Sequence, residues 1–141
     1  MAATTKLDEL LAVFLAELDE DLHPEFVKGT LTRHPELLNM TTAAPFKMTL
    51  LHAAAGRRSD TLHMLLTMGA DPNLTEPGER SPLHYAVMSE KEENVFNLLL
   101  FGANSEHLDA LGKKPVDYAK GYVKEVLTQR AKNLEAKKSF L

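Results

Sequence analysis

Residues 81–86, Ser-Pro-Leu-His-Tyr-Ala, decide the fold, because the chain carries two related copies of this stretch. Thr-Leu-Leu-His-Ala-Ala precedes it at 49–54, and Lys-Pro-Val-Asp-Tyr-Ala follows it at 114–119. A second pattern alternates with the first, since a pair of leucines leads to Gly69-Ala70 and another pair leads to Gly102-Ala103. Self-similarity with a period of about 33 residues predicts one supersecondary unit stacked on copies of itself.

Local signals predict that each unit is a pair of helices followed by a hairpin-like connector. Thr49 and Ser81 are residue types that begin helices as N-caps. Gly56 is predicted to end the first helix of its unit as a left-handed C-terminal cap. Residues 69–80 and 102–113 are rich in turn-forming residues and have no helical period. The pattern therefore favours an all-α solenoid.

The repeated segments resemble the ankyrin repeat, whose motif runs Asp-x-x-Gly-x-Thr-Pro-Leu-His-x-Ala and closes on Leu-Leu-x-x-Gly-Ala. Residues 81–86, 98–103 and 109–115 carry the match. The resemblance implies a single all-α ankyrin-repeat domain over residues 1–141, a solenoid of about four helix-turn-helix units whose terminal units act as caps. We expect a degenerate N-terminal unit at 6–39, a second unit at 46–73, a third at 79–106 and a C-terminal capping unit at 112–136.

Three residues depart from the family motif. Leu50 stands where the motif has proline, and Asp117 ends the histidine series. Glu90 occupies a position where the family prefers glycine, which leaves the geometry of that turn open. None of these departures disturbs the period.

Composition excludes several classes of protein. The chain has no cysteine, so disulfide scaffolds, thiolate zinc sites and cysteine nucleophiles are excluded. The apolar stretch 10–18 contains Glu17 and follows acidic residues, so we expect neither a secretory signal nor a membrane span.

The lysines near the C-terminus have few interleaved aromatics and the net charge is −4, so we expect no nucleic-acid or membrane binding. We expect a monomer in the cytoplasm or the nucleus.

His52 and His84 invite a catalytic or metal-binding interpretation, because imidazole is a common base and metal ligand. They occupy equivalent positions one repeat apart. The family resemblance implies that such histidines bind the backbone of a neighbouring unit, and no other histidine shows the spacing of a metal site. We therefore predict no catalytic, metal-binding or cofactor-binding residues.

The resemblance implies a non-catalytic protein–protein interaction module, an adaptor, inhibitor or regulatory protein that binds a protein partner through its concave face and connector tips. Alignment of the units gives the candidate partner-binding residues, which are Phe46, Met48, Arg80, Leu111 and Lys113 near connector tips and Arg57, Met88, Ser89 and Tyr122 along the inner helices. Phe46 and Leu111 could equally pack within their own hairpins. The other functions left open are a targeting or accessory subunit of an enzyme complex, a microbial or viral effector that mimics host ankyrin proteins and, third, an enzyme. Charge reversal at Arg80 and Lys113 is predicted to weaken binding without unfolding.

Overall fold

The structure, a computed structural model, describes residues 6, 9–12, 24–42 and 47–139, and these ranges contain helices and no strands. The predicted all-α class is therefore confirmed. In chain order the helical elements are α2 (Pro24–Arg33), the 3₁₀ turn η1 (Pro35–Leu38), α3 (Leu50–Ala55), α4 (Ser59–Thr67), α5 (Pro82–Met88), α6 (Glu92–Leu100), the 3₁₀ turn η2 (Pro115–Tyr118) and α7 (Gly121–Ser139).

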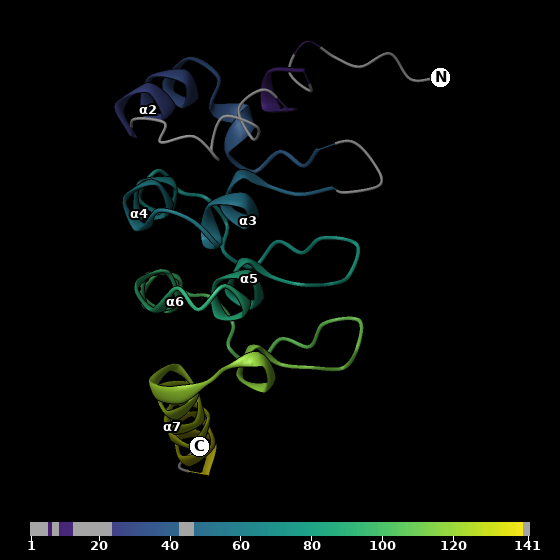
Figure 1. The fold of residues 1–141 in the computed structure, drawn as a ribbon, viewed down its shortest axis with the longest axis vertical. Coiled ribbons are helices and arrows are strands. Elements are labelled where there is room, and N and C mark those ends of the chain that lie inside the picture. The colour runs from purple at the N-terminus through teal and green to yellow at the C-terminus, as the bar shows by residue number, and fades with distance from the viewer. Residues whose placement is uncertain (1–5, 7–8, 13–23, 43–46, 140–141) are drawn as a thin grey trace.

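The elements stack in two columns, with hairpins projecting from one side (Figure 1). In the inner column α3 packs on α5 and α5 packs on η2. In the outer column α2 packs on α4 and α4 packs on α6, while α7 continues the column and packs against η2. We call the hairpin at residues 70–80 the middle finger and the hairpin at residues 103–113 the last finger. The repeat in the sequence is thus a repeat in space.

Leucines of both columns form one continuous core between the units. The leucines at equivalent positions of α3 and α5, Leu51 and Leu83, are fully buried or nearly so, and so are Leu65 and Leu98 of the outer helices. Leu11 near the N-terminus belongs to the same core and has no exposed surface. Because each unit buries its apolar face only against a neighbour, the stack is stable as an array.

The predicted helix starts are confirmed, whereas the predicted role of Gly56 is wrong. The Thr49 side chain accepts a hydrogen bond from the backbone N–H of His52 at 3.3 Å, and Ser81 is the N-cap residue of α5, where its backbone N–H donates to Nδ1 of His84 at 3.2 Å. Gly56 ends α3 with a φ of −94°, which is not left-handed. A Cβ at this position would lie 2.7 Å from Oγ of Ser89 in the next unit. The glycine thus permits a close approach between two repeats.

Left-handed backbone occurs at residues that are not glycine. Glu90 has a φ of 57°, so the turn after α5 keeps the conformation that glycine would favour there. Lys47, Glu79 and Gly112 occupy equivalent positions in three successive connectors, and their φ values are 41°, 58° and 74°. The connector geometry is therefore retained even where a side chain makes it less favourable.

Candidate protein-binding surface

His52 and His84 link each unit to the next connector. The Nε2 atom of His52 donates to the carbonyl oxygen of Arg80 at 3.0 Å, and that of His84 donates to the carbonyl oxygen of Lys113 at 3.1 Å. Both rings are buried, and Nδ1 of His84 accepts from the backbone N–H of Ser81 at 3.2 Å. The expectation that these histidines bind the backbone of a neighbouring unit is confirmed.

The environment of these rings favours neutral imidazole. Burial lowers the pKa of His52 and of His84, and the hydrogen bond from each Nε2 to a backbone carbonyl opposes this shift only in part. The Oγ of Ser81 lies 3.0 Å from Nδ1 of His84, a pairing that also occurs in nucleophilic enzymes. Here both ring nitrogens are engaged and Ser81 is 2% exposed, so no substrate atom can reach the pair. The pair is a helix cap.

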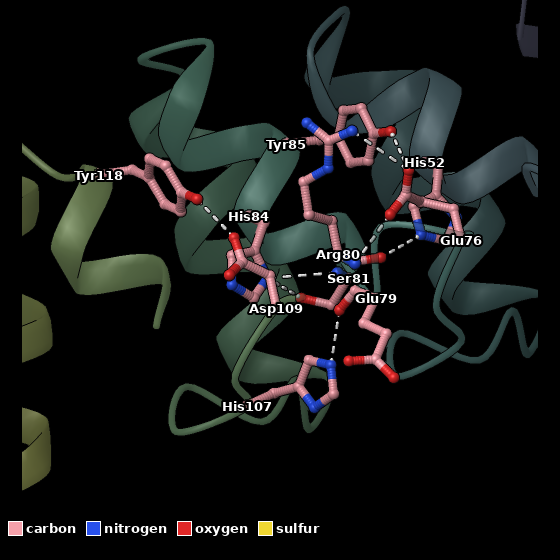
Figure 2. Close-up of polar contacts among 10 residues, drawn as sticks. All are labelled: His52, Glu76, Glu79, Arg80, Ser81, His84, Tyr85, His107, Asp109 and Tyr118. Carbon is pink, nitrogen blue, oxygen red and sulfur yellow. Dashed lines mark hydrogen bonds and ion pairs between the residues drawn. The ribbon is translucent and has the colours of Figure 1, made fainter. Parts of the chain in front are cut away.

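A buried carboxylate organises the middle finger (Figure 2). Glu76 is 8% exposed and accepts hydrogen bonds from the backbone N–H of Arg80 at 2.9 Å, from Nη2 of Arg80 at 3.3 Å and from the hydroxyl of Tyr85 at 3.2 Å. The guanidinium carbon of Arg80 lies 5.4 Å from the centre of the Tyr85 ring. Burial alone would raise the pKa of Glu76, but the hydrogen bonds and charge of Arg80 outweigh it and hold the pKa below its ordinary value.

The last finger repeats this arrangement at equivalent positions. Asp109 accepts from the backbone N–H groups of Leu111 at 3.0 Å and Lys113 at 2.9 Å, and from the hydroxyl of Tyr118. The Tyr118 bond is the main cause that lowers the pKa of Asp109. The Nζ of Lys113 lies 5.5 Å from the centre of the Tyr118 ring. Carboxylate, cation and tyrosine thus recur as one unit in both fingers.

Sequence reasoning missed the carboxylates and the tyrosines of these two networks. The signal was present in the period, since Glu76 and Asp109 are one repeat apart, as are Tyr85 and Tyr118.

Hydrogen bonds also join the two fingers to each other. Nε2 of His107 donates to the carbonyl oxygen of Glu79 at 2.7 Å. The backbone N–H of Ala110 donates to the carbonyl oxygen of Gly78 at 2.8 Å. Figure 2 shows the first of these bonds beside the Asp109 network. Neighbouring fingers therefore hold each other in place.

The finger residues predicted to bind a partner have different surroundings. Leu111 is 76% exposed at the tip of the last finger, and Lys113 is exposed beside it. Arg80 is half-buried against Glu76 and Tyr85. Met48 is half-buried, and its backbone pairs with Thr42. Phe46 lies outside the described residues.

The other four predicted residues lie away from the fingers. Arg57, Met88 and Ser89 lie at the ends of the inner helices, where the chain turns toward the outer column, and Met88 is 44% exposed. The prediction that Tyr122 lies along the inner helices is wrong. Tyr122 lies in α7 of the outer column, where its ring contacts the Phe96 ring of α6 edge to face, with 6.1 Å between the ring centres. The reason is that the chain re-enters the outer column at Gly121.

Within residues 6, 9–12, 24–42 and 47–139, no group of three or more histidine, aspartate or glutamate side chains is placed to hold a metal ion. Nor does any helix there combine the length and the apolar character needed to cross a bilayer.

The sequence of this chain is similar to those of known ankyrin-repeat proteins. The family model described as ankyrin repeats (3 copies) matches residues 13–131. An ankyrin and IPT/TIG repeat-containing protein of Schizosaccharomyces pombe is 30% identical over 112 residues, which is 79% of this chain and 10% of that protein. The chain thus spans about a tenth of the length of that relative. Ankyrin repeats generally act as non-catalytic modules that mediate protein–protein interaction. The chain belongs to the ankyrin repeat family.

Proposed function

We propose that this protein binds a protein partner through the last finger and the surface between the fingers and the inner helices, as an adaptor, inhibitor or other regulatory module. The observation that carries the proposal is the tip of the last finger, where Leu111 projects its apolar side chain into solvent. The fold makes little use of this side chain, because it is 76% exposed.

Rigidity supports the same surface. Asp109 holds the backbone on both sides of the tip through its bonds to Leu111 and Lys113, and Gly112 closes the turn with a φ of 74°. A loop that is already ordered loses little conformational entropy on binding. An exposed leucine beside an exposed lysine on such a loop suits a partner that offers an apolar pocket with an acidic rim.

Arg80 is a poorer probe of this surface than Lys113. Its guanidinium already pairs with Glu76 and stacks on Tyr85, so charge reversal there would place two carboxylates side by side. No contact among the described residues favours the alternatives of an accessory subunit of an enzyme complex or a microbial or viral effector.

The test is quantitative affinity capture from extracts of the cells that make the protein. The double variant Leu111→Ser, Lys113→Glu is compared with the wild type and with Phe26→Ser, whose aromatic side chain is 53% exposed on α2 of the outer column. We expect a partner that the wild type and Phe26→Ser retain and that the double variant loses, with all three proteins folded. A set of captured proteins that is the same for all three would refute the proposed surface.

A further inference from the structure

The outer column opens between its last two helices. Figure 1 shows α4 and α6 nearly end-on, whereas α7 runs downward away from α6. A groove of about 580 Å³ lies between α6 and α7. We call it the α6–α7 groove, and its walls include Phe96, Leu99, Leu100, Val126, Arg130 and Asn133.

The α6 wall of the groove is apolar where the equivalent surface of the preceding unit is polar. Phe96 and Leu100 stand one repeat after His63 and Thr67 of α4. All four side chains are exposed, and Leu100 is 78% exposed. The Phe96 ring is 36% exposed and packs in part against Tyr122, but polar residues are the ordinary occupants of an exposed helix face, so the fold itself does not need Leu100. An exposed apolar wall of this kind marks a surface that another molecule covers.

The α7 wall carries one charged side chain, the cation Arg130, beside Val126, Gln129 and Asn133. Lys137 continues the same face of α7 one turn beyond the groove. The Nε atom of Arg130 is buried and has no hydrogen-bond partner among the described residues. A buried N–H group without an acceptor is unfavourable, and a charged donor forms its strongest hydrogen bonds with carboxylates. The groove therefore combines an apolar wall with an unsatisfied cationic donor.

We propose that the α6–α7 groove binds an amphipathic, acidic helix of a partner protein. Two apolar side chains of that helix, one turn apart, cover Phe96 and Leu100, and a carboxylate one or two turns further accepts from Arg130. The α7 wall from Val126 to Asn133 is about 10 Å long at 1.5 Å per residue, which matches about two turns of a bound helix. This is the helix-in-groove mode of recognition, on the face opposite the fingers.

A second copy of the chain fits the groove less well than an acidic helix. In a symmetric dimer through this surface, the α7 face of each copy, which carries Arg130 and Lys137 and no acidic residue, would be part of the surface that covers the other copy. Like charges that face each other across a desolvated interface oppose association. Charge complementarity thus selects an acidic occupant.

The test uses two synthetic helical peptides with the same leucine stripe, one with glutamates and one with lysines beside it. Each is titrated into the full-length, ¹⁵N-labelled protein while backbone amide resonances are followed. We expect the acidic peptide to shift resonances of α6 and α7 and to bind at least about tenfold more tightly than the basic peptide. Equal affinity for the two peptides, absence of binding, or shifts confined to the fingers would overturn the proposal.

Matched variants assign the binding to the groove. Leu100→Ser should weaken the acidic peptide about tenfold, whereas Leu111→Ser, at an equally exposed leucine of the last finger, should leave its affinity unchanged. Arg130→Gln should abolish the preference for the acidic peptide, whereas Lys132→Gln, with the same loss of charge on another face of α7, should keep it. Sedimentation that shows a dimer broken by Leu100→Ser would assign the groove to a second copy instead. Because the affinity-capture test perturbs the last finger, the two proposals can fail independently.

Discussion

Replacing Glu76 by alanine should destabilise the protein far more than an ordinary surface substitution. The carboxylate is 8% exposed and accepts three hydrogen bonds that join the base of the middle finger to Arg80 and Tyr85. Its removal leaves the backbone N–H of Arg80 facing an apolar methyl group, and it leaves the guanidinium without its ion-pair partner. The finger therefore loses the contacts that fix its shape.

The size of the effect follows from these contacts. A buried donor left without an acceptor costs about 1–3 kcal/mol. The bonds from Nη2 of Arg80 and from the Tyr85 hydroxyl add less, because both side chains are only half-buried and water can replace the carboxylate. We therefore expect Glu76→Ala to lower the free energy of unfolding by about 2–3 kcal/mol. For a chain of this length that corresponds to a Tm lower by roughly 6–12 °C.

Urea unfolding followed by circular dichroism measures this change. Glu79→Ala is the matched control, since it removes an exposed carboxylate three residues away in the same finger and should change stability by less than about 0.5 kcal/mol. Glu76→Asp should retain much of the stability, because aspartate serves at the equivalent position of the last finger. If Glu76→Ala and Glu79→Ala have the same midpoint, the carboxylate does not hold the finger and the reasoning is refuted.

The remaining predictions concern backbone strain and pH. Gly112→Ala should cost about 1 kcal/mol from its φ of 74° alone, because an added Cβ would meet no atom within 4 Å, and Glu79→Gly should gain roughly 0.5 kcal/mol; urea midpoints that do not move in opposite directions would contradict this. Because burial lowers the pKa of His52 and His84 below 6.5, the unfolded chain binds protons first on acidification, so the free energy of unfolding should be highest above pH 6.5 and decrease as the pH falls below it. The slope is at most about 1.4 kcal/mol per pH unit for each histidine, and Tm measured from pH 7.5 to 5.5 should decrease less steeply in His84→Gln than in the wild type; equal slopes would contradict this.

The sequence predicted the architecture well because the physics of a repeat is local. Each unit uses the same caps and the same leucine pairs, so the period alone places helices and connectors. The prediction for Gly56 failed for a reason that no local rule contains. The glycine permits a close approach to Ser89, which lies one full repeat further along the chain and comes close only when the two units stack.

The candidate site was predictable only in part, for a similar reason. Leu111 and Lys113 stand out in the sequence as residues of a connector, and the structure places both on the surface. Arg80 looks equivalent to Lys113 in the sequence, yet a salt bridge of 3.3 Å to Glu76 occupies its charge. Tyr122 lies on the outer column and not along the inner helices because the fourth unit has a short 3₁₀ turn, η2, in place of a full first helix, so that the chain reaches the outer column early.

A comparison of equivalent positions separates the residues that hold the stack from those that the stack does not require. The carboxylates at 76 and 109 and the tyrosines at 85 and 118 keep their chemistry from one unit to the next and are engaged in hydrogen bonds. Thr67 and Gly78, in contrast, are replaced one repeat later by Leu100 and Leu111, the two most exposed leucines among the described residues. Burial cannot account for an apolar side chain that stays in water. The last finger and the α6–α7 groove, on opposite faces of the molecule, are therefore where a partner would supply the contacts that the fold does not.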